Sequence, residues 1–573
     1  MSFLEHDPEM QKMAGFNPAP VAPVKGEVLP PDAGATPTAM VGESFDAANR
    51  ISQEMLLWQP SHRSADGDIS PGKSIMDARV RDTVRNDAYA AAGAKIRQDS
   101  IIGGMFLLNA KPDYEYLIRQ NKAMDETWAQ EFQAEAESKF TLWAESPSAY
   151  VDAQRISTLT GMLRLAISMY TLTGEVLATC EYPRDRKPFR TAIQMIDPDR
   201  LSTPPSMREG PQIRMGVEKG RYGEPIAYHI RNTHPGDFNY GPNNFTRVAK
   251  TYSWGREKVI HIFEQQRPGQ TRGYSPMVAA LKETRITKRF REVTLQNAVL
   301  NATYAATIES ELPSEMVFQA LGGGQLDPNA VSKALGNIAG GYMNAYDAYA
   351  KNAEGLVIDG LKIPHLMPGM KLNLHSPSQG GLIGTDFEQS LIRYIAAILD
   401  VSYEQLSKDY SKTNYSSARA ANNETWKAMQ SQKRSVADRF ATTVYALWLE
   451  EAFATNQITS MPANQPSFWE GMNREAYTQC DWIGASRGQI DELKETQAAV
   501  LRIQNGLSTY EEEHAKLGKD WRRVFSQAAR EQADINERGL MFPGNQEMMA
   551  ALNTSQTADN PDGASDTKGS SNA

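Results

Sequence analysis

The chain has 573 residues, 40% hydrophobic and 23% charged, which is ordinary globular composition and enough for two to four packed units. Its formal net charge of −9 argues against a protein that grips nucleic acid over a wide basic surface, because neutralised phosphates supply most of that affinity. Its two cysteines, Cys180 and Cys480, lie far apart, which excludes a disulfide framework and favours a reducing cytoplasm.

No segment reaches the roughly 18 apolar residues that a membrane span needs, so no membrane helix is predicted. No apolar core follows a basic start, so no signal peptide is predicted either. Residues 1 to about 45 are rich in Pro, Gly and Ala, and the end of the chain is rich in small polar residues. Such segments bury too little apolar surface to offset their chain entropy, so we predict disorder at both ends.

Apolar residues recur at helical spacing in the first third of the chain, which predicts helices over 74–100, 125–145 and 153–169. The pattern then changes to short β-prone runs broken by Gly and Pro between Tyr170 and Glu264. This part of the chain is therefore expected to combine helices with a β-rich region.

Helix returns at about Ser275, where Ile286, Phe290 and Val293 step by four and three and so share one face. Residues 310–380 are mixed and suggest a strand pair in GLVIDGLKIPHL and KLNLHS. A second apolar-faced helix is predicted from about Asp386 to Leu399.

A polar stretch at 407–417 leads into the longest periodic segment, 416–454, whose near-heptad spacing is broken by Lys433. One helix over this segment would be roughly 55–60 Å long, which suits an element spanning a large assembly. A last helical region is expected at about 486–540, where Ser508 and Glu511 predict a capping box.

Gly67–Ser74 reads GDISPGKS and matches the phosphate-binding pattern GxxxxGK[ST], with a helix after it. A phosphate-binding loop must be launched from a buried strand, but the preceding SHRSAD is polar, and Pro71 removes one N–H from the cradle. We therefore interpret the segment as a polar linker with a turn at Pro71–Gly72, leading into a helix.

The eight histidines do not cluster like metal ligands; His229 and His234 are five apart, in or beside a loop. Glu511–His514 resembles an acidic cluster, but a helix start favours acids and explains it without a metal. No catalytic arrangement can be argued from spacing, so no metal, cofactor or enzymatic activity is predicted.

A basic stripe marks the helix that starts near Ser275. It allows two interpretations: a solvated or inter-subunit salt-bridge face, which we favour, or weak contact with DNA phosphates. The stripe consists of Lys282, Arg285, Lys288, Arg289 and Arg291.

Five segments together resemble the lambda-type family of phage portal proteins, in the same order along about residues 75–540. RPGQTRGYSP is similar to the family's RPGQ-x-RG-x-P signature, and DVSYEQLSKDYSKTNYSSAR resembles its tunnel-loop region. The other three are VRNDAYAAAGAKI at 84–96, GVEKGRYGEPIAYHI at 216–230 and WIGASRGQIDELKETQAAVLRIQNGLSTYEEEHAKLGKDW at 482–521.

The resemblance implies an α+β portal fold in a ring oligomer, with a mixed α/β wing, a helical stem, a small α/β clip and a helical C-terminal region. Laid on this chain, the expected regions are a disordered arm 1–45, the wing 46–274, the first stem helix 275–300, the clip 301–385, the second stem helix 386–400, the tunnel loop 401–415, the long helix 416–454, a crown-side helical region 455–545 and a disordered tail 546–573.

The same resemblance implies a ring, usually of twelve, at one vertex of the virion capsid, assembled in the host cytoplasm. Double-stranded DNA would pass non-specifically through its channel. The other implied partners are the terminase large subunit, head-completion or adaptor proteins, and the major capsid and scaffold proteins. The loop residues expected to face the DNA are Lys408, Asp409, Tyr410, Ser411, Lys412, Thr413, Asn414 and Tyr415.

Two other functions remain open at the level of sequence. The match at Gly67–Ser74 keeps an ATP-driven packaging motor in view, and nucleotide binding would discriminate it. A plain capsid or scaffold protein is the other, and only the portal is expected to form a ring with an axial hole.

Overall fold

The computed structural model describes residues 57–58, 60–237, 244–304, 340–341, 344, 357–358, 361–362, 380–411, 413–488 and 491–538. The chain divides into two compact units, residues 1–63 and 64–573, and every element below belongs to the second. The predicted disordered arm and tail and most of the predicted clip lie outside the described residues.

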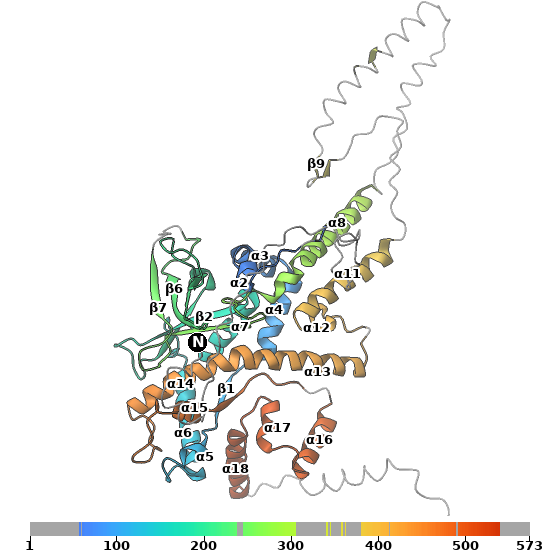
Figure 1. Cartoon of the computed structure of the whole chain (residues 1–573). Helices are drawn as coiled ribbons and strands as arrows, with labels where there is room; N and C mark the ends of the chain where they lie inside the picture. The colour runs from blue at the N-terminus through green and yellow to red at the C-terminus, as the bar shows by residue number, and fades with distance from the viewer. Residues whose placement is uncertain are drawn as a thin grey trace, which may run out of the picture. The chain divides into compact units, whose positions relative to one another are not determined.

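A group of helices opens this unit (Figure 1). Asp87 divides two of them, because its extended backbone ends one helix and its carboxylate accepts hydrogen bonds from free N–H groups of the next. The predicted helix start near Ala153 is wrong: Asp152 accepts three backbone N–H groups that follow it and holds a turn, so the helix begins at Leu159. The group comprises α2 (Ala65–Ile69), α3 (Lys73–Asn86), α4 (Ala88–Ile101), α5 (Tyr114–Leu117), α6 (Glu126–Ala144) and α7 (Leu159–Thr173).

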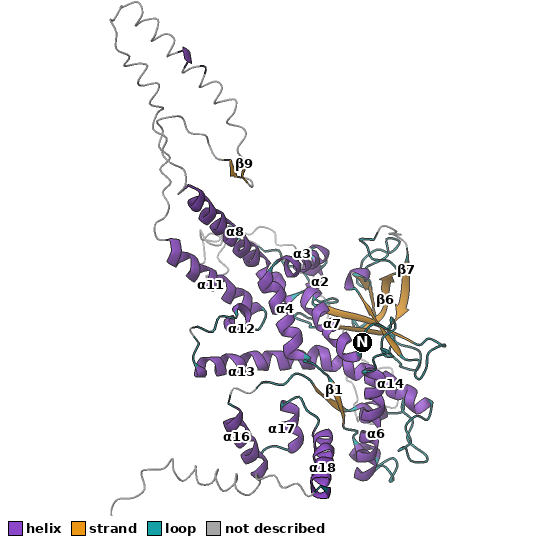
Figure 2. Cartoon of the chain, turned by 180° about the vertical axis from the view of Figure 1, so that it is seen from behind, coloured by secondary structure: helices purple, strands orange, loops and turns teal. Residues whose placement is uncertain are grey.

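The predicted β-rich part forms two antiparallel sheets, of three and four strands (Figure 2). In the first, a central strand, buried along most of its length, pairs with both neighbours, so Leu177 lies opposite Ile196 on one side and His261 on the other. The second sheet is a meander, and Val217 and Tyr228 pack with Leu177 in a small shared core. The sheets are β3 (Ala192–Ile196), β2 (Glu175–Glu181) and β8 (Val259–Phe263), and β4 (Ile213–Arg214), β5 (Val217–Lys219), β6 (Pro225–Arg231) and β7 (Phe245–Ala249).

A third pairing joins distant parts of the sequence. β1 (Leu107–Ala110) runs antiparallel to β11 (Cys480–Ile483), with Leu107 opposite Ile483. The strand pair ties the N-terminal helices to the C-terminal part of the chain.

Two helices lie side by side at the positions predicted for the stem. They are α8 (Leu281–Tyr304), entered through the 3-10 turn η4 (Pro276–Ala280), and α11 (Gly380–Ile398). Phe290 meets Phe387 edge-on, with ring centroids 5.4 Å apart. In the sequence between these helices, β9 (Val357–Ile358) and β10 (Leu361–Lys362) form an antiparallel pair inside GLVIDGLKIPHL. KLNLHS lies outside the described residues.

The predicted long helix is confirmed, but it is not α-helical throughout. α13 (Tyr415–Gln432) and α14 (Arg439–Ala454) are joined by η5 (Lys433–Asp438), one π-helical stretch. Lys433, which breaks the heptad spacing, starts this stretch, is buried, and bonds Asp438 at 2.8 Å. A π turn carries an extra residue, so it resets the apolar face where the sequence pattern is broken.

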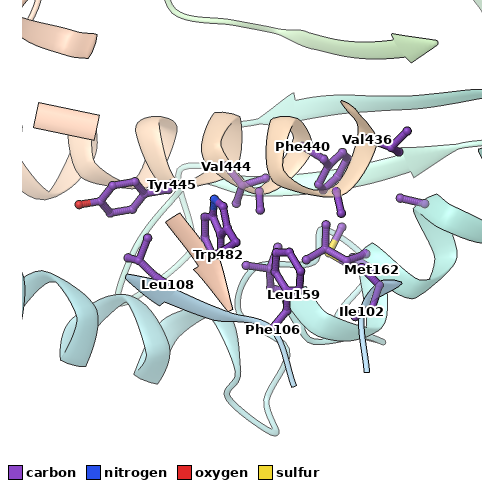
Figure 3. Close-up of a cluster of buried hydrophobic side chains, with 14 of the residues drawn as sticks. Ile102, Phe106, Leu108, Leu159, Met162, Val436, Phe440, Val444, Tyr445 and Trp482 are labelled. Carbon is purple, nitrogen blue, oxygen red and sulfur yellow. The ribbon is translucent and has the colours of Figure 1, made fainter. Parts of the chain in front are cut away.

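The main core lies under α14 (Figure 3). Phe440 is fully enclosed, as is Val444 one turn later. The same cluster contains Leu159 of α7 and a stacked pair made by Phe106 and Trp482, whose ring centroids are 5.5 Å apart. The core therefore joins the long helix to α7 and to the β1–β11 pair.

The C-terminal region is helical as predicted. Its helices are α15 (Asn473–Thr478), α16 (Glu492–Gln504), α17 (Tyr510–Lys516) and α18 (Trp521–Glu537). The predicted capping box is wrong in register: Thr509 is the N-cap of α17 and accepts from the Glu512 N–H, while the Ser508 hydroxyl bonds the Glu512 carboxylate. Within the described residues, every helix is too short or too polar to cross a bilayer.

Candidate functional site

The segment that matches the phosphate-binding pattern has the wrong geometry for that role. Gly67 lies inside the short helix α2, and Lys73 is the first residue of α3. A helix, a turn and a helix thus replace the strand, loop and helix that cradle phosphates.

The turn at Pro71–Gly72 and the helix after it are as predicted, but Lys73 is buried and fully engaged, which a polar linker does not predict. Its ammonium donates to the Asp77 carboxylate and to the backbone oxygen of Thr173, each at 2.7 Å. It also lies 3.3 Å from Glu175, whose side chain is completely enclosed. Its position in the sequence gave no sign of these partners, because two of them lie about 100 residues away.

The signature segment supplies the second cation of this cluster. Arg272 forks onto Glu175 through Nε and Nη2, and Nη1 donates to the backbone oxygen of Leu201 at 2.6 Å. Nη2 also donates to the backbone oxygen of Pro198 at 2.8 Å. Arg272 thus links β2 to the chain that leaves β3, and its guanidinium faces the interior of the protein.

The residues of the signature on either side of Arg272 make close contacts with α2 and with the end of α7. A Cβ on Gly273 would lie 2.0 Å from the backbone oxygen of Gly174, and Gly174 itself has a left-handed φ of +77° at the end of α7. Thr271 donates to the Asp66 carboxylate through its N–H at 2.8 Å and through its hydroxyl at 2.5 Å. We call Lys73, Asp77, Glu175, His261 and Arg272 the buried charge cluster.

The carboxyl groups of the buried charge cluster differ in their pKa values. Burial raises the pKa of Asp77 to about 6, although Lys73 opposes the shift. Burial also acts to raise the pKa of Glu175, but attraction to Arg272 and Lys73 outweighs it and holds that pKa well below its usual value. Burial lowers the pKa of His261, which lies 3.1 Å from Glu175. Glu175 therefore stays ionised, and both Arg272 and Lys73 pair with it.

The predicted tunnel loop is partly helical, because α12 (Tyr403–Ser407) occupies its first half. Ser402 and Gln405 form a capping box at its start, and Leu406 is buried against the body. Lys408 ends the helix in a left-handed conformation, with φ +59°. The Asn414 side chain caps α13 through the Ser417 N–H at 2.8 Å, so both ends of the loop are fixed.

The remaining loop residues differ in exposure. Lys408, Tyr410 and Ser411 are exposed, Tyr410 to 56%, while Asp409 and Thr413 are half-buried. Lys412 and the side chain of Tyr415 lie outside the described residues. Between this loop and α13 is a cavity of about 330 Å³, lined in part by Tyr410 and Thr413.

The predicted basic stripe on α8 divides into two groups. Lys288 and Arg291 face their own chain: Lys288 reaches the backbone oxygen of Asn86 at 3.4 Å, and Arg291 lies 3.2 Å from Asp87 and 3.5 Å from Glu388. The other three residues are exposed on one side of the helix, namely Lys282, Arg285 and Arg289.

The histidines considered above are placed differently from each other. His229 lies on β6, not in a loop, and is buried 2.6 Å from Glu218. His234 lies near Asp197 and Asp199, and the three could together reach one ion. Arg81 already pairs with both of these carboxylates, so one of their two negative charges is balanced within the chain.

A family comparison places the chain in a class of structural proteins of the phage particle. Residues 52–433 match the model of the phage portal protein, lambda family. The chain therefore belongs to the lambda family of phage portal proteins, and portal function follows from that membership.

Individual relatives agree. The chain is 36% identical to the portal protein of Escherichia phage N15 over 488 residues, 85% of this chain and 89% of that one. It is also 36% identical to portal protein B of Escherichia phage lambda over 495 residues, covering 86% and 89%. Neither the comparisons nor the described residues support a packaging motor or a plain capsid protein.

Two solved structures are also similar in part. One is the virion of a native gene transfer agent particle, with 16% identity, a TM-score of 0.31, and coverage of 74% of this chain and 98% of that one. The other is the neck of that native particle computed with C12 symmetry, with 16% identity, a TM-score of 0.30, and coverage of 73% and 96%. The assignment above rests on the sequence relatives alone.

Proposed function

We propose that copies of this chain form a ring at one capsid vertex, that double-stranded DNA passes through its channel during packaging and ejection, and that the chain does this without catalysis. Family membership supports the proposal. So does the formal charge of −9 per chain, because a channel of acidic subunits offers the duplex no deep well in which to stall.

The observation that carries the proposal furthest is the loop between α12 and α13. Leu406 anchors one end and the Asn414 cap the other, while Lys408 and Tyr410 between them are exposed. A short exposed segment held at both ends can touch a passing backbone and detach from it, since exposed ionic contacts are individually weak and are screened by salt.

The test is a double variant, Lys408→Ala with Lys412→Ala. We expect rings and capsids of normal size and yield, with a lower packaging rate or poorer retention of the packaged genome. The control is Lys122→Ala with Lys187→Ala, which removes two exposed lysines elsewhere. Wild-type packaging kinetics and full retention in the loop variant would remove the loop from the DNA path.

For the exposed part of the basic stripe, we favour pairing with acidic groups of the adjacent subunit over contact with DNA. Lys282 and Arg285, together with Arg79 and Met76 on α3, line an open cavity of about 550 Å³. The same wall includes the acids Asp82 and Asp87. A wall that mixes both signs of charge with apolar side chains suits a protein surface better than a phosphate backbone. The remaining proposals follow the family: the clip would meet the terminase large subunit and later the head-completion proteins, and the wing would meet the major capsid and scaffold proteins.

A further inference from the structure

The three helices α16, α17 and α18 have no apolar core of their own. All of residues 491–538 are described, and only Ser508 and Glu513, both polar, are buried. Helices of 13, 7 and 17 residues are marginal in water without tertiary packing. Several large apolar side chains of this segment are instead exposed, namely Leu493, Val500, Leu501, Leu507, Tyr510, Leu517 and Phe525.

Within the described residues, the middle helix has the shortest contacts with the body, and α18 adds one longer hydrogen bond, from Arg523 to Thr141 at 3.4 Å. Glu511 of α17 pairs with Lys111 at 2.6 Å and accepts from Asn109 at 2.7 Å. α17 lies between the other two helices (Figures 1 and 2): Arg502 of α16 forks onto Glu513 at 2.9 and 2.8 Å, and Phe525 of α18 packs on Tyr510.

The apolar face of α16 is turned away from its own chain. Leu493 and Val500 are two turns apart and lie above one another, with exposed fractions of 61% and 45%. Arg502, nine residues after Leu493, lies about 180° around the helix and is the residue that holds α17. The Arg502–Glu513 pair, which joins α16 to α17 within the described residues, is thus on the side opposite the apolar face.

We infer that the apolar face of α16, defined as Leu493, Val500 and Leu501, packs against the α17–α18 side of a second copy of this chain. The inference rests on the proposed ring. Such a ring joins two different patches head to tail. The two ends of the segment differ in charge even after their local ion pairs, Asp491 with Lys494 and Asp520 with Arg523, are counted. Glu492 then remains at the start of α16, whereas Arg522 remains at the start of α18.

The test is Leu493→Asp, compared with Leu507→Asp. An acid at position 493 lies in the first turn of α16, where the helix dipole favours it, so this change should leave the helix of the free subunit intact. Leu507 is 76% exposed in the loop after α16, outside the apolar face, and provides the same exchange as a control.

Hydrogen exchange of the α16 amides is measured in free subunits and in assembled rings. We expect at least about tenfold slower exchange in wild-type rings, loss of that protection in Leu493→Asp, and wild-type protection in Leu507→Asp. Rings whose α16 amides exchange as in free subunits would overturn the inference and leave the ring intact. Protection that appears only when capsid proteins are added would overturn it in favour of a different partner. Absence of any wild-type ring would overturn the proposed function as well.

Discussion

Two polar, lysine-bearing segments each lead into a helix, yet one is fixed in the interior and the other is exposed. Lys73 enters α3 with its ammonium held by Asp77 and Glu175. Lys408 enters the loop before α13 with its side chain exposed. What separates them is a carboxylate about 100 residues from Lys73, so a lysine's role is decided by the tertiary partner and not by the local motif.

The largest loss of stability is expected when the buried charge cluster loses Arg272. Arg272→Met leaves Glu175 enclosed with only Lys73 to balance it, and breaking a buried ion pair costs about 3–5 kcal/mol. Chemical denaturation should show that loss, and the subunit should be recovered poorly. Arg267→Met, at an exposed arginine of the same signature, serves as the control. Equal stability of the two variants would refute the buried charge cluster as a stabilising element.

A smaller loss is expected for Lys73→Met, because Arg272 remains on Glu175. We expect the free energy of unfolding to fall by about 2–3 kcal/mol. Reduced packaging by this variant would then reflect instability and not loss of nucleotide binding. Calorimetric titration of wild-type protein with ATP and Mg²⁺ separates the two, and saturable binding that Lys73→Met abolishes would restore the nucleotide-binding interpretation.

The third prediction concerns pH at the same segment. Burial raises the pKa of Asp77 to about 6, so the folded state holds this proton more tightly than the unfolded chain does. Asp77 therefore stabilises the fold most at low pH, and its contribution falls as pH rises from about 4 to about 6. The free energy of unfolding of the wild type, minus that of Asp77→Asn, should therefore decrease by about 2 kcal/mol over that pH interval, as measured by chemical denaturation. A difference that does not change with pH would contradict the raised pKa.

The smallest effect is expected in the exposed segment. Lys408→Gly removes the charge and suits the left-handed backbone at φ +59°. The free energy of unfolding should therefore stay the same or rise by less than about 1 kcal/mol, which a melting curve would show as an unchanged or slightly higher melting temperature. Lys408→Ala removes the same charge but keeps the strain. If both variants retain the genome equally poorly, the charge is what matters; if only one does, the loop conformation is.

Periodic apolar spacing was sufficient to predict the long helix and the helices α8 and α11. It could not predict the π turn itself, although Lys433 marked its place by interrupting the heptads. The buried charge cluster was out of reach, because Lys73 and Glu175 meet only through the tertiary fold. Arg272 carried one usable sign, its place in the family signature, and the structure gives that signature an interior role.

The pairing of β1 with β11 has a consequence for synthesis of the chain. Its partners lie about 370 residues apart, so β1 stays without its partner until nearly the whole protein has left the ribosome. At about 5–20 residues per second that delay is roughly 20–70 s. Throughout it, Phe106 and Leu108 lack the side chain of Trp482 that later covers them. During this interval β1 is available to a chaperone or to a neighbouring nascent chain, either of which can bind it before β11 has been synthesised.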